Sequence, residues 1–443
     1  MLKTTMAAAR YLLTSVCMCV LGILFLTSFE QRINLEPTIL VSGIVFFSSV
    51  VILITVFKSL DRASPHLALS TTLYLFLSNL KARHDGLRAL KMFLHNCKDV
   101  YPAQQKLLRD IIHKNSATDY GRKFGIGTIL SLEDLRKRHP LTNYDHYESF
   151  VQRVAQGEPH VMTRDPPTRF CRSNGTTGNC KLVPQDGKKL LPKVRAVLKG
   201  VMHENFPKMT SIQRIMKLYI HVNLDESKCG IPMTSVTAID PKVMKYMVSY
   251  TTPPEGLLLN TLFDALYIHL LFGLRERSLG VIEASFIMTV EEAIRILMSE
   301  WENLVEDLKT GTIYEGVHLE PNMRSALSKA LGNGDVARAN EVEVEIRKGP
   351  IGIVKRLWPN IAFIGCIDNL GRKPYLQTTF AAGEFRSTRT ATLALKELKV
   401  STCGHSMTTR NSFLSTMQQF LNLFQRKQWM KIIHRHVSFM KLK

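Results

Sequence analysis

Two long uncharged runs near the N-terminus constrain this chain more than any other feature. The first, Tyr11 to Phe29, has 19 residues, and the second, Pro37 to Phe57, has 21. A helix of 19 residues rises about 28 Å, close to the thickness of the hydrocarbon core of a bilayer. The short link between the runs is charged. The pattern therefore predicts a membrane-anchoring helical hairpin in residues 1–65, followed by a folded body.

The charges beside these runs predict their orientation. Lys3 and Arg10 precede the first run, Lys58 and Arg62 follow the second, and the link holds one arginine. Because basic residues favour the cytoplasmic side, we expect the body to face the cytoplasm. We expect the membrane to be an intracellular one, with the endoplasmic reticulum as the leading candidate. The alternative for the first run is a cleaved signal peptide, but a small-x-small exit is not evident, and the second run would still anchor the chain.

The composition describes a folded body and narrows its partners. The chain of 443 residues is 45% hydrophobic and 21% charged, which favours a sizeable core over disorder. Its formal charge of +21 is compatible with binding to nucleic acid, to an anionic bilayer or to phosphorylated small molecules. We do not expect nucleic acid, because the charge is spread or confined to the C-terminal tail. The eight cysteines include no C-x-x-C pair, so we expect a reducing compartment and no protein-held metal.

Two packing helices are expected where the body begins. Apolar residues alternate with Lys, Arg and His between Leu67 and Asp99. The following stretch, 103–125, carries leucine and isoleucine at helical spacing before it breaks toward Gly121 and Gly125.

A candidate phosphate-binding segment, CRSNGTTGNCKLVP, spans Cys171 to Pro184. Small residues let a backbone approach an anion closely, hydroxyl groups donate to phosphate oxygens, and a lysine at the end adds positive charge. The segment is not a Walker loop, because Cys180 rather than glycine precedes Lys181. Taken alone, such a run is also compatible with an ordinary surface loop.

This segment resembles the first nucleotide motif of the adenylate-forming superfamily, in which Ser or Thr and Gly residues precede a lysine. From about Ala103 to Trp358 the chain resembles the Gretchen Hagen family of auxin-responsive acyl-acid amido synthetases. The landmarks are HPLTNYDHYESFVQRVAQGEPHVMTRDPPTRF before the loop, LLLNTLFDALYIHLLFGLRERSLGVIEASF in the middle and RLWPN at Arg356 to Asn360. The apolar N-terminus resembles that of the animal members.

The resemblance implies a fold, a reaction and a set of ligands. The fold would be α/β, the firefly-luciferase-like large domain of adenylate-forming enzymes, in residues 66–383. The reaction would be ATP-dependent activation of a carboxylic acid as an acyl adenylate, with Mg²⁺ on the triphosphate, followed by attack of an amine or amino acid to form an amide. Lys181 would be the catalytic residue. The phosphates would be held by the residues of the loop: Ser173, Asn174, Gly175, Thr176, Thr177 and Gly178. Asn174 departs from the usual Ser or Thr, but its amide can also donate a hydrogen bond.

The downstream part of the chain departs from the family. The family's second motif, an aromatic residue with Ser or Thr next to Glu, is not found, and neither is its later Tyr and Asp ribose motif. The resemblance stops near Gly383, and residues 384–443 form a divergent basic tail, so we expect a member that is truncated or differently ended. The alternative function is therefore a non-catalytic, membrane-anchored binding or scaffold protein that retains part of the adenylation fold.

Other polar residues are interpreted as structural. His269 and Asp264 lie in an apolar helical run, where a satisfied interior position is the simplest expectation. The acids Glu300, Glu302, Glu306 and Asp307 interleave with apolar residues, as in a solvated helix face.

Overall fold

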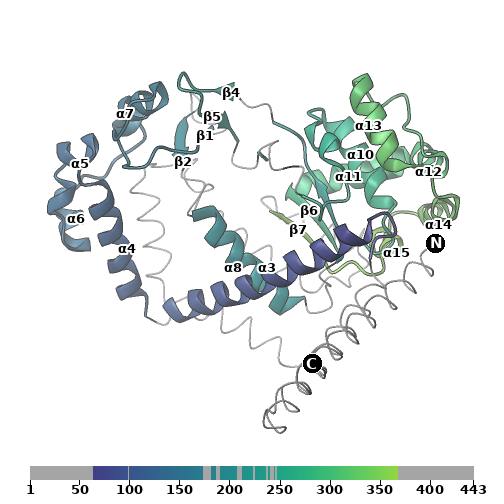
Figure 1. The fold of residues 1–443 in the computed structure, drawn as a ribbon, viewed down its shortest axis with the longest axis horizontal. Coiled ribbons are helices and arrows are strands. Elements are labelled where there is room, and N and C mark those ends of the chain that lie inside the picture. The colour runs from purple at the N-terminus through teal and green to yellow at the C-terminus, as the bar shows by residue number, and fades with distance from the viewer. Residues whose placement is uncertain are drawn as a thin grey trace, which may run out of the picture.

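The computed structural model describes residues 63–97, 99–172, 181–185, 190–206, 212–222, 225–235, 238–239, 244 and 247–367. Both apolar runs, the loop 173–180 and the tail lie outside the described residues. Two groups of elements stand at opposite sides of Figure 1, and the long helix α3 runs between them. The described part combines α-helices with two small β-sheets, which is the α/β character expected from the sequence.

The helices that precede the first strand are α3 and the helices of the first group. They are α3 (Leu69–Asn96), α4 (Val100–Asn115), α5 (Asp119–Lys123), η1 (Ile126–Thr128), α6 (Leu132–Arg138) and α7 (Asp145–Gln156). The first two confirm the two predicted packing helices. Local sequence sets the ends: the Ser131 hydroxyl accepts a hydrogen bond from the Asp134 amide at the start of α6 (3.1 Å), and α7 ends at Gly157, whose φ is +98°.

A four-stranded sheet adjoins these helices. Its strands are β1 (Arg169–Arg172), β2 (Leu182–Gln185), β4 (Asp225–Glu226) and β5 (Pro232–Thr234). The order is β2-β1-β5-β4, with β1 antiparallel to β2 and parallel to β5. The side chain of Phe170 on β1 is fully buried in the same apolar cluster as Tyr147 and Phe150 of α7. This cluster fixes β1, and with it the β1–β2 hairpin, to α7.

The second group is built on a three-stranded parallel sheet. Its strands are β3 (Ile215–Leu218), β6 (Val281–Phe286) and β7 (Phe363–Ile367), in the order β3-β6-β7. The helical elements of this part are α8 (Leu190–Asn205), η2 (Pro254–Leu258), α10 (Leu262–Leu274), α11 (Ile287–Ser299), α12 (Trp301–Thr310), α13 (Pro321–Leu331), α14 (Val336–Arg347) and α15 (Ile353–Leu357). Parallel strands require crossover connections, and the helices between β6 and β7 form one of them. The largest apolar core lies here and includes Trp358, fully buried beneath α10.

Helices α3 and α8 cross at two glycines. A Cβ atom built on Gly200 would lie 2.3 Å from the carbonyl oxygen of Gly86, and one built on Gly86 would lie 2.8 Å from the amide nitrogen of Gly200. Only glycine permits backbones to approach this closely. The crossing attaches α3 to the part of the chain that leads into β3.

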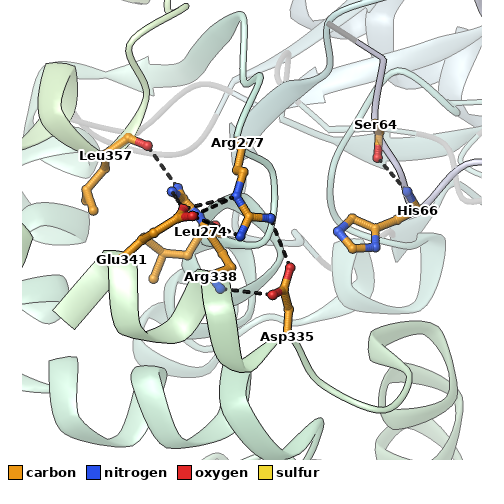
Figure 2. A network of polar contacts seen from close by, with 8 residues as sticks. All are labelled: Ser64, His66, Leu274, Arg277, Asp335, Arg338, Glu341 and Leu357. Carbon is orange, nitrogen blue, oxygen red and sulfur yellow. Dashed lines mark hydrogen bonds and ion pairs between the residues drawn. The ribbon is translucent and has the colours of Figure 1, made fainter. Parts of the chain in front are cut away.

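Residues 63–67 pack against the body immediately before α3. The Ser64 hydroxyl donates to Glu276 Oε1 (2.6 Å), and Arg214 pairs with the same oxygen (3.0 Å). The Ser64 and Glu276 side chains are buried. Figure 2 shows Ser64 and His66 beside a second group of ion pairs, in which Arg277 contacts Asp335.

The second group of ion pairs joins α14 to the ends of α10 and α15. The buried Arg338 of α14 donates to the carbonyl oxygens of Leu274 (2.7 Å) and Leu357 (2.8 Å), and it also pairs with Glu341 (Figure 2). Both carbonyls stand at helix ends, where no intrahelical donor reaches them. Arg338 therefore satisfies two helix ends with one side chain.

The predicted location at an intracellular membrane is corrected. Crossing a bilayer takes about 20 consecutive apolar residues. Among the described residues no helix meets this need, and even α3, which is long enough, carries charges along its length. The prediction that the endoplasmic reticulum membrane holds the protein is therefore not retained.

Candidate functional site

The β1–β2 hairpin brings together the ends of the predicted phosphate-binding loop. Arg172, the last residue of β1, lies opposite Leu182, the first residue of β2, in an antiparallel pair. Ser173, Asn174, Gly175, Thr176, Thr177 and Gly178 belong to the connection between these strands and lie outside the described residues. Lys181 is described, and it directly precedes β2. The stem therefore places the predicted lysine at the base of the loop.

Tyr144 holds the first residue of β2. Its hydroxyl donates to the carbonyl oxygen of Leu182 (3.1 Å) and accepts from the Leu182 amide (3.0 Å). The Lys181 ammonium lies 5.7 Å from the centroid of the Tyr144 ring, within the range of a cation–π contact. Tyr144 thus fixes the strand and contacts the lysine beside it. Sequence analysis missed this residue, because its partner is 38 positions away.

At the same end of the stem, an ion pair joins the last residue of β1 to β4. Arg172 contacts Asp225 of β4 at 2.5 Å, and both side chains are exposed. Exposed pairs of this kind contribute about 0–1 kcal/mol, so the stem depends more on Phe170 and Tyr144 than on this contact.

His269 is a satisfied interior histidine, as predicted. Its Nε2 lies 2.6 Å from the Tyr219 carbonyl oxygen and its Nδ1 lies 2.8 Å from the Thr252 hydroxyl. A carbonyl can only accept, so Nε2 carries the proton and Nδ1 accepts from Thr252. Burial lowers the pKa of His269 to about 4, so the ring is neutral at physiological pH. Asp264 is also buried, and it accepts from the His318 amide (2.9 Å).

One acid of the predicted helix face is not at the surface. Asp307 is buried, although Glu302 and Glu306 are exposed as expected. Its Oδ2 accepts from the hydroxyl of Tyr267 (2.8 Å) and from the amide of Tyr314 (2.8 Å). Burial raises the pKa of Asp307, and the two donors oppose that rise. The prediction for Asp307 is wrong because the spacing of residues along one helix does not show contacts from other elements. Both donors, Tyr267 and Tyr314, lie outside α12.

A lysine and a glutamate on the three-stranded sheet also escaped sequence analysis. Lys217 of β3 lies beside Glu283 of β6 in the parallel register, and its ammonium lies 2.6 Å from Glu283 Oε1. The ammonium is also 5.4 Å from the centroid of the Tyr250 ring. Burial alone would lower the pKa of Lys217, but Glu283 and Tyr250 together raise it, so the ammonium stays charged. The only sequence signal was a lysine inside a short apolar strand.

The described residues give no ligands for Mg²⁺. No group of three or more His, Cys, Asp or Glu side chains within them could hold a metal ion. We therefore assign no metal ligand. A loop of hydroxyls and glycines closed by a β-hairpin and followed by a lysine does suit a phosphate chain.

Comparisons with known proteins fit this arrangement. A sequence model of a family, described as the GH3 family N-terminal domain, matches residues 89–382. A relative named as a probable indole-3-acetic acid-amido synthetase of Oryza sativa subsp. japonica is 28% identical over 298 residues, which is 62% of this chain and 47% of the relative. An indole-3-acetic acid-amido synthetase of Arabidopsis thaliana is 26% identical over 302 residues, which is 63% of this chain and 49% of the relative.

Solved structures share the fold. An acyl acid amido synthetase matches with a TM-score of 0.55 and 22% identity, over 63% of this chain and 50% of that one. A complex of such an enzyme with 2,4-DB matches with a TM-score of 0.58 and 21% identity, over 66% of this chain and 53% of that one. The chain spans about half the length of the curated relatives that it matches.

Proposed function

Because the chain belongs to the GH3 family, whose N-terminal domain model covers residues 89–382, we propose that it is an adenylate-forming ligase that joins a carboxylic acid to an amine. In the first step a carboxylate oxygen of the acid attacks the α-phosphorus of ATP, and pyrophosphate leaves. In the second step the amine nitrogen attacks the acyl carbon, loses a proton and displaces AMP. The product is an amide.

The physical reason for the first step is the low reactivity of a carboxylate. Its negative charge repels nucleophiles, and oxide is a poor leaving group. Adenylation removes the charge and supplies a better leaving group. The protein contributes mainly by holding the reactants and by stabilising the charge that develops on the phosphates.

The observation that carries this proposal is the position of Lys181 at the base of the loop that connects β1 and β2. Its side chain is half-buried beside Tyr144, and the loop that it follows contains hydroxyl groups and glycines. We propose that backbone and side-chain donors of Ser173 to Gly178 hold the phosphates of ATP, and that Lys181 offsets their charge. Mg²⁺ would be carried on the triphosphate.

The substrates belong to the same proposal. The relatives are named for indole-3-acetic acid, and their reaction class joins an acid to an amine. We propose a carboxylic acid and an amine or amino acid as the substrate classes of this chain, with the adenylation body in residues 66–383.

The test is acid-dependent exchange of pyrophosphate into ATP over a panel of carboxylic acids. Exchange reports the first step alone, because labelled pyrophosphate enters ATP only when formation of the acyl adenylate runs in reverse. Lys181→Ala should lower the exchange rate by a factor of about 100 or more, the size of losing a group that stabilises developing charge. Lys137→Ala, at an exposed lysine of α6, is the matched control and should retain the wild-type rate.

The outcomes separate the ligase from a non-catalytic binding protein. Exchange that depends on acid and is lost only in Lys181→Ala supports the ligase. If wild-type protein with a normal melting transition binds ATP but shows no exchange with any acid, the ligase proposal fails and a non-catalytic binding role replaces it.

A further inference from the structure

Two histidines share one tyrosine hydroxyl beside the first turn of α7. The hydroxyl oxygen of Tyr120 in α5 lies 2.6 Å from Nε2 of His139, which directly follows α6, and 3.1 Å from Nε2 of His146 in α7. Tyr120 and His139 are buried, and His146 is half-buried. This hydroxyl therefore links α5, the end of α6 and the start of α7.

The contacts of His139 determine where the protons of this network lie. Its Nδ1 is 2.9 Å from the carbonyl oxygen of Pro140, which can only accept, so the neutral ring carries its proton on Nδ1. Nε2 then accepts from the hydroxyl of Tyr120. Because that hydroxyl has a single proton, its oxygen accepts from Nε2–H of His146. The hydrogen bonds thus run from His146 through Tyr120 to His139, and this direction requires a neutral His139.

Acid reverses the hydrogen bond at His139. A protonated imidazole carries protons on both nitrogens, so Nε2 becomes a donor and the Tyr120 hydroxyl can no longer donate to it. That hydroxyl then turns to the hydroxyl of Tyr147 in α7, which lies 3.4 Å away, beyond the usual O–H···O distance. Tyr147 also has its own contact with the Thr142 hydroxyl (2.7 Å). The first turn of α7 must therefore shift before the network is satisfied again.

The groups around the two rings oppose a positive charge. The neighbours of His146 include Phe124, with ring centroids 4.9 Å apart, and Lys123, whose ammonium lies 5.7 Å from the centroid of the Phe124 ring. The charges that act on the two rings are those of each other and of Lys123, and no carboxylate in the described part of the chain is among them. Protonation therefore adds positive charge where no negative charge offsets it.

Burial and these charges decide when the rings are neutral. Burial lowers the pKa of His139, and the charge of His146 lowers it further against the opposing contact with Pro140. Burial also lowers the pKa of His146, and the charge of Lys123 adds to this. Both pKa values lie below the value of about 6.5 in an unfolded chain, so the neutral network is fully present above that pH and is lost as the pH falls through the lowered values.

The first turn of α7 connects this network to the predicted phosphate-binding loop. Tyr144 directly precedes α7, and its carbonyl oxygen accepts from the Tyr147 amide (2.8 Å). The Tyr144 side chain holds Leu182 and contacts Lys181. Tyr144 and His146 are two positions apart at the start of one helix, so a shift of this turn moves the side chain that positions Lys181.

We propose that His139 and His146 are positioning residues that make the hold of the loop on ATP depend on pH, because they fix the first turn of α7 only while their rings are neutral. Histidine suits this role, since its charge changes nearer to neutral pH than that of other unperturbed side chains. The inference rests on the proposed function for its ligand, ATP. It concerns the position of Lys181 and not the chemical step.

The first test needs no nucleotide. Hydrogen–deuterium exchange of a peptide that covers residues 181–185 is measured at pH 7 and pH 5, and each rate is divided by that of the unfolded chain at the same pH. We expect the protection of the wild type to fall about tenfold at pH 5, the effect of losing one hydrogen bond. His139→Gln/His146→Gln keeps an acceptor and a donor for Tyr120 but cannot be protonated, so its protection should be nearly equal at both pH values.

The second test measures the Kd for ATP by calorimetry at the same two pH values. The Kd of the wild type should rise about tenfold more between pH 7 and pH 5 than that of the double variant. The phosphates of ATP also titrate in this range, but they do so for every protein tested and cancel in the comparison. His113→Gln, at an exposed histidine of α4, is the matched control and should behave as the wild type does.

A second variant covers the case in which the double variant lacks a normal melting transition. Tyr120→Phe removes the shared hydroxyl and keeps the ring, so its protection at pH 7 should already be as low as that of the wild type at pH 5. A fall in protection that persists in these variants, or no fall in the wild type, overturns the proposal. A fall that the variants abolish, in protein that binds no ATP at pH 7, counts against the proposed function and not against the positioning network.

Discussion

At the scale of single residues, Tyr144 shows how one side chain can position a loop that it does not belong to. Its hydroxyl satisfies both backbone groups of Leu182, and its ring contacts Lys181. No pattern in the sequence could reveal this, because the contact joins the start of α7 to the start of β2 through the fold alone.

Tyr144→Phe should loosen β2 while leaving the aromatic ring in place. Two hydrogen bonds are lost, each with a net contribution of about 1 kcal/mol. We expect faster hydrogen–deuterium exchange in a peptide that covers residues 181–185, and an increase of several-fold in KM for ATP. Tyr101→Phe, at an exposed tyrosine of α4, is the control. Unchanged exchange at Leu182 would show that the hydroxyl does not hold the strand.

His269 gives the molecule a predictable response to acid. Its pKa is about 4 in the folded protein and about 6.5 when unfolded, so the unfolded state binds the proton more readily. The stabilisation is fully present above pH 6.5 and is lost as the pH falls toward 4, by on the order of 3 kcal/mol.

His269→Gln keeps a donor for Tyr219 and an acceptor for Thr252 but does not titrate. The free energy of unfolding should therefore fall less between pH 7 and pH 4.5 in this variant than in the wild type. Other histidines with lowered pKa values, such as His139 and His203, contribute equally to both proteins and cancel in the comparison. Urea titrations at the two pH values measure this difference, and an equal fall in the free energy of unfolding in both proteins would contradict the assignment.

At the scale of elements, the sequence predicted the positions of helices better than the contacts between them. Leucine and isoleucine spacing located α3 and α4 because helical periodicity is a local property. The same reasoning put Asp307 on the surface, since a helix-face pattern cannot show that Tyr267 and Tyr314 approach from elsewhere. The crossing of α3 and α8 was equally out of reach, because nothing local marks Gly86 and Gly200 as partners.

Gly200→Ala tests this crossing. The added methyl group would meet the Gly86 carbonyl at 2.3 Å, so the helices must separate. Overpacking of this kind costs about 1–3 kcal/mol, more than the gain in helix propensity from alanine. The melting temperature should fall by several degrees, whereas Asp85→Ala, at an exposed position beside Gly86, should leave it unchanged or slightly raised. A melting temperature that rises in Gly200→Ala would exclude the close contact.

At the scale of the whole molecule, segments far apart in the sequence meet at Glu276. Ser64, from the segment before α3, donates to it across 212 positions, and Arg214, directly before β3, pairs with it. Arg214 also donates to the carbonyl oxygen of Tyr250, whose ring centroid lies 5.4 Å from the Lys217 ammonium. The sequence motif predicted the loop that ends in Lys181, but long-range convergence of this kind depends on the folded chain.

The last prediction concerns the loss of stability when the contacts of Glu276 are removed singly and together. Ser64→Ala removes one hydrogen bond to a charged group and should cost about 1.5–3 kcal/mol in the free energy of unfolding. Glu276→Gln leaves the partly buried Arg214 without its buried counter-charge and should cost about 3 kcal/mol. The double variant should lose less than the sum, because Ser64 has no carboxylate left to bind once Glu276 is replaced. Ser325→Ala, at an exposed serine of α13, should change nothing. Chemical denaturation of the four proteins measures the coupling, and strictly additive losses would mean that the segment before α3 is stabilised independently of Glu276.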